Sequence, residues 1–586
     1  MRKTKIICTL GPSTDKEDIL EDLMLSGMDV ARLNMSHQTR ELQKVRIDKI
    51  KKIRDKIKKP IAILLDTKGP EIRIGKFKDQ KVELTEGQQF TLYTTEKLGD
   101  KYGVSISYKD LQKDIYPGVK ILIDDGLVEL KVLEYDDKKI ICKVINSGIL
   151  SNNKSLNIPQ IHLSLPFLSP NDIKDVEFAV KENVDFIAAS FTRSADDIRL
   201  LKKELQKNNG EYIKTIAKIE NLDGVKNIDE ILSLSDGIMV ARGDLGVEVS
   251  MEEIPIIQKE LIKKANKLGK HVIIATQMLD SMINNPRPTR AEATDVSNAI
   301  YEGASAIMLS GETASGKYPI QSVKTMAKIA TRIELDINYS KQFFEKNTVV
   351  NSNVTSAISH ATCSTAYDLG AKAIITATKS GRTAEAISKY RPSCRVIAGT
   401  TNETALRQMN LLWGVTPILM KEKGSTDQIF NHVVKSAQKN GHVLTGDLVV
   451  LTVGIPFGIS GTTNLLKVHL VGNILVSGTG INSGYVCANL CVCKNEKDVM
   501  NQFKSGDILV IPEVSKNLIE IVKEASGIVI ENDIAETLID ELKTFSNKPT
   551  IVGAKNATTL LKNGTAVTLN ADKGIVFSDE KLDIMS

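Results

Sequence analysis

Short apolar runs that end abruptly in glycine or polar residues recur along the first half of the chain, and a helical pattern follows each of them. Fully apolar runs of this length that alternate with helices are typical of parallel strands buried on both faces. Eight such units predict an α/β protein built on a (β/α)8 TIM barrel. The predicted strands are residues 6–10, 28–33, 61–65, 184–189, 215–219, 237–240, 271–275 and 304–309.

The segments between these runs have the periodicity of amphipathic helices. After the first run, Thr14 and Glu17 have the spacing of a capping box, apolar residues follow at helical spacing, and Gly27 can end the helix. Residues 49–59 are strongly basic, but isoleucines at 50, 53 and 57 recur at helical spacing. This pattern predicts a helix packed on the core with a solvated lysine face.

One connection breaks the rhythm, because more than a hundred residues separate the third and fourth runs. The inserted part is rich in Val, Ile, Thr and Gly, and it alternates in polarity over residues 120–131. We interpret it as a small β-barrel inserted into a barrel loop as a lid. The predicted domains are the barrel (1–70 and 164–345), the lid (71–163), an α/β domain (346–473) and a further C-terminal domain (474–586).

Composition narrows the possible partners. The 77 Lys and Arg residues are interleaved with 72 Asp and Glu residues, for a formal net charge of +5. This balance predicts neither nucleic acid nor a membrane surface as a partner. The first residues contain no apolar segment of signal-peptide length, and the seven cysteines are scattered. We therefore expect a cytoplasmic protein with reduced thiols.

Polar residues converge where the predicted strands end, which is the catalytic face of such barrels. Glu220 and Asp244 end neighbouring strands and could share one magnesium ion, which takes oxygen ligands. Lys218 lies two residues before Glu220 and so shares its face, where a cation would stabilise charge on a transferring phosphoryl group. Each of these residues alone could equally be a salt-bridge partner or a solvated strand end. Other such ends carry Arg32, which could donate a fork of hydrogen bonds to phosphate, the pair Ser190 and Phe191, Thr276, Ser310 and Glu312.

Two further groups at these ends suit ions or carboxylates. Gly243 and Asp244 could begin a short helix whose free amides would hold a carboxylate. A second set offers uncharged oxygens and one carboxylate, a mixture suited to a weakly charged cation: Asn34, Ser36, Asp66 and Thr67.

Eight motifs together carry a resemblance to a known family. Taken in order, they closely resemble the pyruvate kinases over about residues 1–473, and the number of long motifs in the correct order makes the resemblance specific. The motifs are ICTLGPS (7–13), VARLNMSH (30–37), LDTKGPEIR (65–73), AKIEN (217–221), MVARGDLG (239–246), ATQML (275–279), PTRAE (288–292) and MLSGETA (308–314).

The resemblance implies phosphoryl transfer from phosphoenolpyruvate to ADP, with Mg²⁺ (or Mn²⁺) and K⁺ as cofactors, in a homotetramer. Arg32 and Lys218 would contact the phosphoryl group, Lys218 as the transition-state stabiliser. Thr276 would deliver the proton to the enolate, with Ser310 and Glu312 as relay members. The other implied sites are Glu220 and Asp244 for magnesium, Gly243, Asp244 and Thr276 for phosphoenolpyruvate, Asn34, Ser36, Asp66 and Thr67 for potassium, and Asn34, His37, Arg73 and Lys154 for ADP or ATP.

A loop of the α/β domain is a candidate effector site. Residues 373–378 are typical of a strand, 379–383 of a loop and 384–390 of a helix. A Ser/Gly/Thr loop at a helix start can cradle phosphate, although any βα turn has similar residues. The resemblance favours a sugar-phosphate or nucleotide effector here, with residues 454–464 as a second effector loop. The candidate residues are Thr378, Lys379, Ser380, Gly381, Arg382 and Thr383.

The last segment resembles the swivelling phosphohistidine domain of phosphoenolpyruvate-using enzymes, in particular at residues 506–512 and 548–553. The Gly-Gly-x-Thr-Ser-His stretch of that family is missing from the corresponding region, 530–536, and no histidine follows His469. Cys487, Cys491 and Cys493 cluster in this segment without a second ligand pair, so a zinc site is not expected.

Two alternatives remain from the residues themselves. One is a magnesium-dependent barrel enzyme that forms enolates, such as a lyase of keto acids, which would also use Lys218, Glu220 and Asp244. The other is a catalytically inactive sugar-phosphate sensor, which retention of these three residues disfavours.

Overall fold

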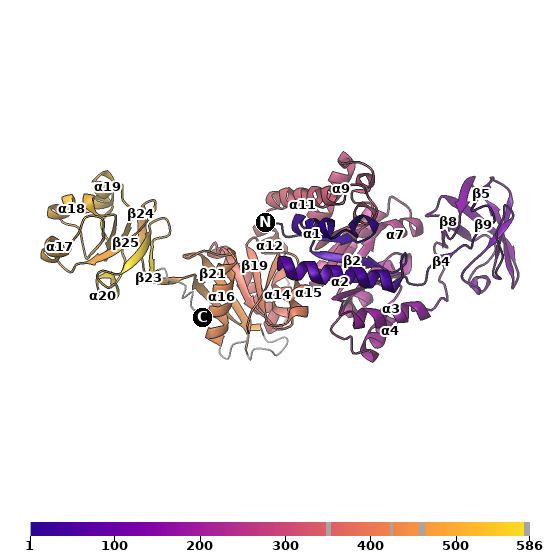
Figure 1. Ribbon diagram of the computed structural model, residues 1–586, viewed down its shortest axis with the longest axis horizontal. Helices are drawn as coiled ribbons and strands as arrows, with labels where there is room; N and C mark the ends of the chain where they lie inside the picture. Colours follow the sequence, from indigo (N-terminus) through magenta and orange to yellow (C-terminus); the bar gives the residue numbers. More distant parts are fainter. Residues whose placement is uncertain (1, 347–352, 422–425, 456–462, 546, 579–586) are drawn as a thin grey trace. The chain divides into compact units, whose positions relative to one another are not determined.

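The computed structural model describes residues 2–346, 353–421, 426–455, 463–545 and 547–578 (Figure 1). Backbone contacts divide the chain into two compact units. The first unit is Met1–Cys363, Thr376–Glu422 and Val453–Leu465, and the second is Ser364–Ile375, Lys423–Thr452 and Leu466–Ser586. The barrel and the lid therefore belong to the first unit and the C-terminal domain to the second.

Eight parallel strands close into a barrel in the order β1-β17-β16-β15-β14-β13-β3-β2, which confirms the predicted fold class. The strands are β1 (Lys5–Thr9), β2 (Val30–Asn34), β3 (Ala62–Asp66), β13 (Phe186–Ala189), β14 (Lys214–Ile219), β15 (Gly237–Ala241), β16 (His271–Ala275) and β17 (Ala306–Leu309).

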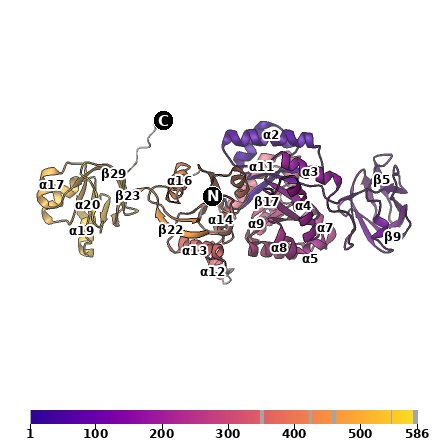
Figure 2. The same ribbon diagram turned by 90° about the horizontal axis from the view of Figure 1, so that it is seen from below.

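Helices surround the barrel strands, as Figure 2 shows for α2, α3, α4, α8 and α9. The helices of this part are α1 (Glu17–Ser26), α2 (Arg40–Ile57), α3 (Pro170–Lys181), α4 (Ala195–Lys207), α5 (Leu222–Lys226), α6 (Ile228–Leu234), α7 (Arg242–Glu248), α8 (Ile254–Leu268), α9 (Arg290–Glu302), α10 (Gly311–Ala314), α11 (Pro319–Asp336) and α12 (Tyr339–Lys346).

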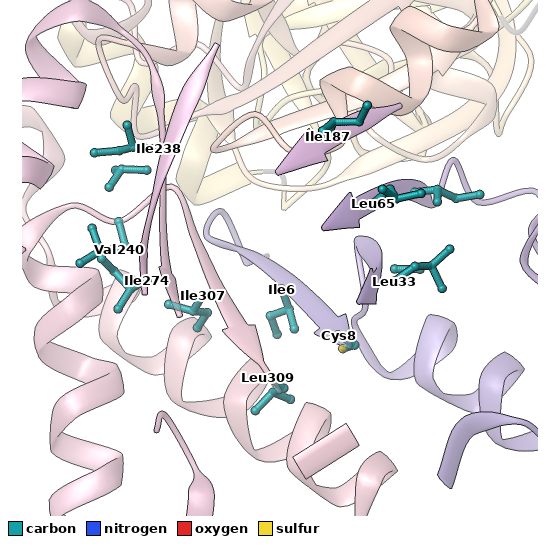
Figure 3. Close-up of a cluster of buried hydrophobic side chains, with 14 of the residues drawn as sticks. Ile6, Cys8, Leu33, Leu65, Ile187, Ile238, Val240, Ile274, Ile307 and Leu309 are labelled. Carbon is teal, nitrogen blue, oxygen red and sulfur yellow. The ribbon is translucent and has the colours of Figure 1, made fainter. Parts of the chain in front are cut away.

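Alternate residues of each barrel strand belong to two different cores. Ile6 and Cys8 of β1 pack in the cluster between strands and helices, part of which is drawn in Figure 3. Ile7, between them, belongs to a second cluster with Leu64 of β3 and Ile216 of β14. Side chains alternate across a strand, so this second cluster fills the barrel interior. Because both faces are buried, the strands have the continuous apolar runs that the sequence displays.

The predicted start of the first helix is wrong in detail. Lys16 is the N-cap of α1 and its side chain makes no capping hydrogen bond. Thr14 belongs instead to a 3-10 turn, where its hydroxyl donates to the carbonyl oxygen of Gly11 at 2.9 Å. This local hydrogen bond keeps Thr14 from capping α1. Gly27 does end the helix, with a φ of +133°.

The lysine-rich stretch forms the second half of α2, as predicted. Ile50 and Ile53 are buried in the outer core cluster. On the other face, Lys52 and Lys56 pair with Glu17 and Glu21 of α1 at 3.0 and 2.7 Å. The basic run is therefore a solvated face of a core-packed helix.

The insertion is a β-domain around a core of its own. Its main sheet has the order β4-β12-β8-β9-β10-β6-β7, and a two-stranded sheet pairs β11 with β5. Hydrogen bonds from Gly75 N to Ser105 O (2.8 Å) and from Ser107 N to Arg73 O (2.9 Å) join the two ends of the main sheet, which closes it into a small barrel. The strands are β4 (Ile72–Arg73), β5 (Lys81–Leu84), β6 (Gln89–Tyr93), β7 (Gly103–Ser105), β8 (Lys120–Ile123), β9 (Val128–Tyr135), β10 (Lys139–Val144), β11 (Gly148–Ser151) and β12 (Ser155–Asn157).

The α/β domain contains a five-stranded sheet in the order β20-β19-β18-β21-β22. Its elements are α13 (Val354–Asp368), β18 (Ala373–Ala377), α14 (Arg382–Ser388), β19 (Arg395–Thr400), α15 (Glu403–Met409), β20 (Val415–Leu419), α16 (Thr426–Lys439), β21 (Leu448–Gly454) and β22 (Thr463–Leu470). The structure therefore has the strand, loop and helix predicted at 373–390, with the helix beginning earlier, at Arg382.

The C-terminal domain is an eight-stranded sheet with short helices, in the order β23-β30-β29-β25-β26-β27-β28-β24. Its strands are β23 (Asn473–Ser477), β24 (Thr479–Asn482), β25 (Tyr485–Val492), β26 (Ile508–Ile511), β27 (Gly527–Ile530), β28 (Thr550–Val552), β29 (Ala566–Asn570) and β30 (Ile575–Ser578), and its helices are α17 (Glu496–Gln502), α18 (Ile519–Glu524), α19 (Glu536–Phe545) and α20 (Ala557–Leu560). Throughout the described ranges, no helix combines the length and the apolar character needed to span a membrane.

Candidate active site

The polar residues at the strand ends continue the interior face of the barrel. Lys218 follows the interior residue Ile216 by two positions, and Asp66 follows Leu64 by two. Strand alternation therefore directs both side chains into the mouth of the barrel, above its apolar filling. Arg32 stands two residues after Val30 on β2 in the same way. The topology thus brings together residues that lie far apart in the sequence.

Lys218 is held by three oxygen atoms. Its Nζ lies 2.8 Å from Glu220 Oε1 and 3.3 Å from Asp66 Oδ1, and it donates to Ser190 Oγ at 2.9 Å. Only 8% of Lys218 is exposed. An ammonium group has three protons, so its hydrogen-bonding capacity is used in full.

Electrostatics keep this lysine charged. Burial alone would lower the pKa of Lys218, but the carboxylates of Asp66 and Glu220 reverse the effect and hold its pKa above the ordinary value. Burial likewise opposes ionisation of Asp66, yet Arg32 and Lys218 hold its pKa below the usual range. The site therefore carries fixed charges where little water dilutes their field.

Arg32 is bound from two sides. Its Nε donates to Asp66 Oδ2 at 3.0 Å, its Nη2 forms an ion pair with the same oxygen, and its Nη1 donates to Thr9 Oγ1 at 2.9 Å. The guanidinium plane is thus fixed before any ligand arrives, which is the geometry in which arginine recognises phosphate best.

Glu220 and Asp244 form a pair of neighbouring carboxyl groups. Burial raises the pKa of both above the ordinary values, while Lys218 opposes the rise. A divalent cation between them would offset this cost, and two carboxylates leave room for water and substrate oxygens, as Mg²⁺ requires. Within the described ranges, no group of three His, Cys, Asp or Glu side chains is arranged to hold a metal ion. The donor set therefore fits a cation shared with substrate better than a closed protein cage.

The start of α7 meets the end of β16. Gly243 N donates to Thr276 Oγ1 at 2.8 Å, and this hydroxyl donates to Ala275 O at 2.6 Å. Thr276 and Gln277 have φ values of +66° and +55°, a left-handed conformation that is uncommon for such residues. Arg242 stabilises this turn, because its Nη2 donates to Thr276 O at 2.8 Å. Such strained turns often lie at functional sites.

The hydrogen-bond partners of Ser310 and Glu312 differ from those expected of a proton relay. Glu312 accepts Leu279 N at 3.0 Å on one carboxylate oxygen and Ser310 N at 2.7 Å on the other. Both oxygens are thus occupied by backbone amides. Among the described residues, the buried Ser310 Oγ has no hydrogen-bond partner. The geometry gives Glu312 a scaffolding contact and leaves the hydroxyl of Ser310 enclosed, without a partner among the described residues.

The four oxygen-bearing residues suited to a monovalent cation lie at two neighbouring strand ends. Asn34 of β2 is the register partner of Asp66 of β3, and Thr67 follows directly. Asn34 Oδ1 accepts Ser36 N at 2.9 Å, which gathers Ser36 into the same turn. The structure thus places these residues at two adjacent strand ends, where the carboxylate of Asp66 also pairs with Arg32 and Lys218.

The residues suggested for the nucleotide lie on two parts of the first unit. Arg73 and Lys154 are in adjacent lid segments, since Arg73 pairs in register with Ser155. Arg73 forms an ion pair with Glu71 at 2.8 Å, and Lys154 one with Asp124 at 2.9 Å. His37 is an exposed residue on the barrel, directly after the turn at Ser36.

Comparisons with known proteins show the family of this chain. The sequence profile described as "Pyruvate kinase, barrel domain" matches residues 1–323, more than half of the chain. A pyruvate kinase of Staphylococcus haemolyticus is 45% identical over 579 residues, which cover 98% of this chain and 99% of that protein. The chain belongs to the pyruvate kinase family.

Other pyruvate kinases extend the comparison. A pyruvate kinase of Sporosarcina psychrophila is 45% identical over 580 residues, covering 99% of each chain. The crystal structure of a pyruvate kinase from Cryptosporidium parvum superposes with a TM-score of 0.76 at 39% identity, covering 80% of this chain and 96% of that one. Members of this family are transferases that act on phosphoenolpyruvate and ADP, so the chain is an enzyme of that class.

The two C-terminal regions also have matches. "Pyruvate kinase, alpha/beta domain" matches residues 356–469, and "PEP-utilising enzyme, mobile domain" matches residues 503–574. The predicted kinship of the tail with phosphoenolpyruvate-using enzymes is thereby confirmed. At the position of the missing histidine stretch, the chain leaves β27 at Ile530, and Glu531 accepts Thr558 N at 2.7 Å.

The effector-loop candidates in this pyruvate kinase divide into buried and exposed residues. Thr378 Oγ1 accepts Gly381 N at 3.0 Å, and Thr383 Oγ1 lies 2.9 Å from Thr463 Oγ1, so both hydroxyls have partners within the fold. Lys379, Ser380 and Arg382 are exposed. The second effector loop suggested at 454–464 falls largely outside the described residues.

A cleft adjoins this loop on one side. Ser380 and Arg382 line a polar cleft of about 900 Å³ together with Lys202 and Lys214 of the barrel. The same cleft is also lined by the carboxylates of Glu211, Asp236 and Glu385, so its charges are mixed.

Sequence reasoning gave Ser190, Phe191 and Arg242 no role, although each touches a candidate residue. Ser190 and Phe191 were noted only as a strand end, because serine and phenylalanine carry no charge that signals chemistry. The predicted barrel already makes β13 and β14 neighbours, but only the structure shows that Ser190 Oγ reaches Lys218 and that Phe191 N reaches Glu220.

Proposed function

We propose that this pyruvate kinase transfers the phosphoryl group of phosphoenolpyruvate to ADP at the mouth of the barrel, with Lys218 as the group that stabilises the transition state. The observation that carries this proposal is the buried, charged Nζ of Lys218, held by Glu220, Asp66 and Ser190. Charge on a phosphoryl group in transfer spreads over its equatorial oxygens, and a fixed cation there lowers the barrier. Arg32, already oriented by Asp66, would bind the same group.

Glu220 and Asp244 are the residues that would hold Mg²⁺, and Asn34, Ser36, Asp66 and Thr67 those that would hold K⁺. The divalent cation, when bound, supplies Lewis acidity toward phosphoryl oxygens and neutralises charge. The neighbouring buried carboxyls and the gathered neutral oxygens support these assignments.

The remaining roles are carried over from the family resemblance. Gly243 N and Thr276 Oγ1 lie within hydrogen-bond distance of each other and would both face the carboxylate of phosphoenolpyruvate. Loss of the phosphoryl group leaves an enolate that must gain a proton. The hydroxyl of Thr276, which donates to Ala275 O in this structure, would turn to donate toward the enolate, with Ser310 next in line. The contacts favour Glu312 as a residue that holds Ser310 over one that carries protons. His37, Arg73 and Lys154 would contact the nucleotide.

A stoichiometric assay tests the reaction. Purified protein with phosphoenolpyruvate, ADP, Mg²⁺ and K⁺ should form pyruvate and ATP in equal amounts, and omission of ADP should stop both. A lyase of keto acids would instead consume its substrate without ADP. Pyruvate formation that is independent of ADP would contradict the proposal.

Regulation by a phosphorylated metabolite is a further part of this proposal. The exposed Lys379, Ser380 and Arg382 at the start of α14 support a sugar-phosphate or AMP site. Titration of activity against a panel of sugar phosphates and AMP would identify the effector. A panel without any activator or inhibitor would count against a regulatory site.

The proposal also covers the oligomeric state, the cellular location and the role of the C-terminal tail. A cytoplasmic homotetramer is carried over from the family resemblance, and light scattering on the purified enzyme tests the tetramer. For the tail we assign a structural or oligomer-contacting role without a phosphorylated intermediate, since phosphohistidine chemistry needs an imidazole and residues 470–586 contain none.

A further inference from the structure

Two consecutive residues directly after β13 contact Lys218 of β14 and Glu220, which follows β14. Ser190 Oγ accepts the ammonium of Lys218 at 2.9 Å, and Phe191 N donates to Glu220 Oε2 at 2.7 Å. Both contacts cross from one strand to its neighbour in the barrel. The end of β13 therefore supports the proposed phosphoryl-stabilising cation and one proposed magnesium ligand together.

The hydroxyl of Ser190 is oriented by contacts on its other side. Ser190 Oγ lies 2.6 Å from Thr67 O and 3.3 Å from Asp66 Oδ1, and Ser190 N donates to Thr67 Oγ1 at 3.1 Å. A hydroxyl has one proton, and the shorter distance assigns it to Thr67 O. The lone pairs of the oxygen then face Lys218. Because Ser190 is only 2% exposed, water does not compete for this position.

The backbone around Ser190 is constrained as well. Phe191 has a φ of +53°, a left-handed conformation that directs its N–H toward Glu220. Gly69, at the start of the connection to the lid, packs directly on this pair. A Cβ at Gly69 would lie 2.9 Å from Ser190 Cβ and 3.1 Å from Phe191 Cδ2. Close packing of this kind fixes Ser190 in one place relative to β3 and β14.

We propose that Ser190 is a positioning residue for the phosphoryl transfer, whose hydroxyl holds the ammonium of Lys218 at the point where the transferring group passes. The inference rests on the proposed role of Lys218. Without Ser190 Oγ, only the two carboxylates would hold the ammonium, and the closer one, Glu220, would draw it away from Thr67 and Asp66. A displaced cation weakens transition-state stabilisation more than substrate binding.

The test compares two buried hydroxyls two residues apart. Ser190→Ala removes the contact with Lys218, and Thr192→Ala removes a buried hydroxyl that donates to the carbonyl of Ala189 at 2.9 Å. We expect Ser190→Ala to lower kcat by about tenfold to a hundredfold with a KM for phosphoenolpyruvate within about twofold, as misplacement of a catalytic group does. Thr192→Ala should keep kcat within about threefold, because its hydroxyl acts on the fold alone. If Ser190→Ala does not fold, Ser190→Cys keeps the size and removes a strong acceptor, and the same fall in kcat is expected.

A double variant distinguishes failure of the inference from failure of the proposed function. In a Lys218→Arg background, Ser190→Ala should cost much less than in the wild type, because the two residues act as one unit. Equal kcat values for Ser190→Ala and Thr192→Ala, alongside an inactive Lys218→Met, would overturn the inference and leave the role of Lys218 standing. An active Lys218→Met would overturn both.

Discussion

The mouth of the barrel and the loop at the start of α14 are both strand ends proposed to receive phosphate, yet they are built in opposite ways. In the barrel, Lys218 and Arg32 are buried and already paired with Asp66. In the loop, Lys379 and Arg382 are exposed, and the threonine hydroxyls beside them are used by the fold. The difference separates a site organised before substrate arrives from one that its ligand must organise.

Burial explains why the two regions suit different tasks. Charges fixed away from water act strongly on charge that develops in a transition state, and they need no reorganisation at that moment. Breaking such a network is costly, because it leaves an uncompensated buried charge. Exposed cations are screened by salt and contribute little until a phosphate binds them. The following predictions test this contrast, beginning with the largest expected effect.

Glu220→Ala removes a buried carboxylate that pairs with Lys218 and is proposed to bind magnesium. We expect kcat to fall by about 10³-fold, since both charge stabilisation and cation binding are lost. Steady-state kinetics at several Mg²⁺ concentrations measure the effect. A variant with wild-type turnover and an unchanged Mg²⁺ requirement would remove Glu220 from the site.

Substitutions of Glu71 test whether activity requires a monovalent cation. The family resemblance associates glutamate at this position with a potassium requirement and lysine with independence, because a lysine ammonium can replace the cation's charge. We expect wild-type activity to fall at least about tenfold when sodium replaces potassium, which corresponds to ~1.4 kcal/mol of barrier. Glu71→Lys should lose most of this dependence, whereas Glu71→Gln, which adds no cation, should keep it. Equal wild-type rates in the two salts would refute the requirement.

Ser380→Asp places a negative charge in the exposed loop. Like-charge repulsion should abolish the response to a phosphorylated effector, while basal kcat stays within about twofold because the barrel site is untouched. The concentration of phosphoenolpyruvate at half-maximal rate, with and without effector, is the readout. Ser380→Ala serves as the uncharged control and should retain part of the response. Full activation of Ser380→Asp would mean that the effector binds elsewhere.

The smallest effect on chemistry is expected from the tail. Within the second unit, Lys573 forms an ion pair with Asp447 at 2.9 Å and donates to Thr445 O at 3.0 Å, so loss of the tail removes contacts with the α/β domain. A chain that ends at Val471 should keep kcat within about threefold and change thermal stability, assembly or effector response. The full-length enzyme incubated with labelled phosphoenolpyruvate should acquire no acid-labile label on its tail. Stoichiometric label there would contradict the structural role.

Much of the fold was predictable because burial on both faces leaves a direct trace in the sequence. The eight apolar runs coincide with the eight barrel strands within a few residues. The insertion, in which polar and apolar residues alternate, forms the closed sheet of the lid. The start of α1 was not predictable from spacing, since the hydroxyl of Thr14 can bond to Gly11 as well as to a helix amide. Local hydrogen bonds of this kind compete without a clear signal in the residue types.

The charged residues of the candidate site could be predicted from the sequence. Lys218, Glu220 and Asp66 were singled out at strand ends, and the structure brings them within ion-pair distance. Ser190 was given no role, because its importance depends on the direction of one hydroxyl, which the sequence does not show. The scaffolding contacts of Glu312 could not be predicted either, because any residue type can supply the backbone amides that its carboxylate accepts.

One comparison of two lysines tests the central claim most directly. Lys214 and Lys218 stand at the beginning and the end of β14, and Lys214 lies 3.7 Å from Glu385 in a partly exposed pair. Each should be replaced by methionine, with kcat and thermal unfolding measured for both variants. We expect Lys218→Met to lose at least about 10³-fold in kcat and remain folded, since its cation acts on the transition state. Measured without any effector, Lys214→Met should keep kcat within about twofold of the wild type, as is usual when a partly exposed ion pair is lost. A Lys218→Met enzyme within tenfold of wild-type turnover would contradict the account.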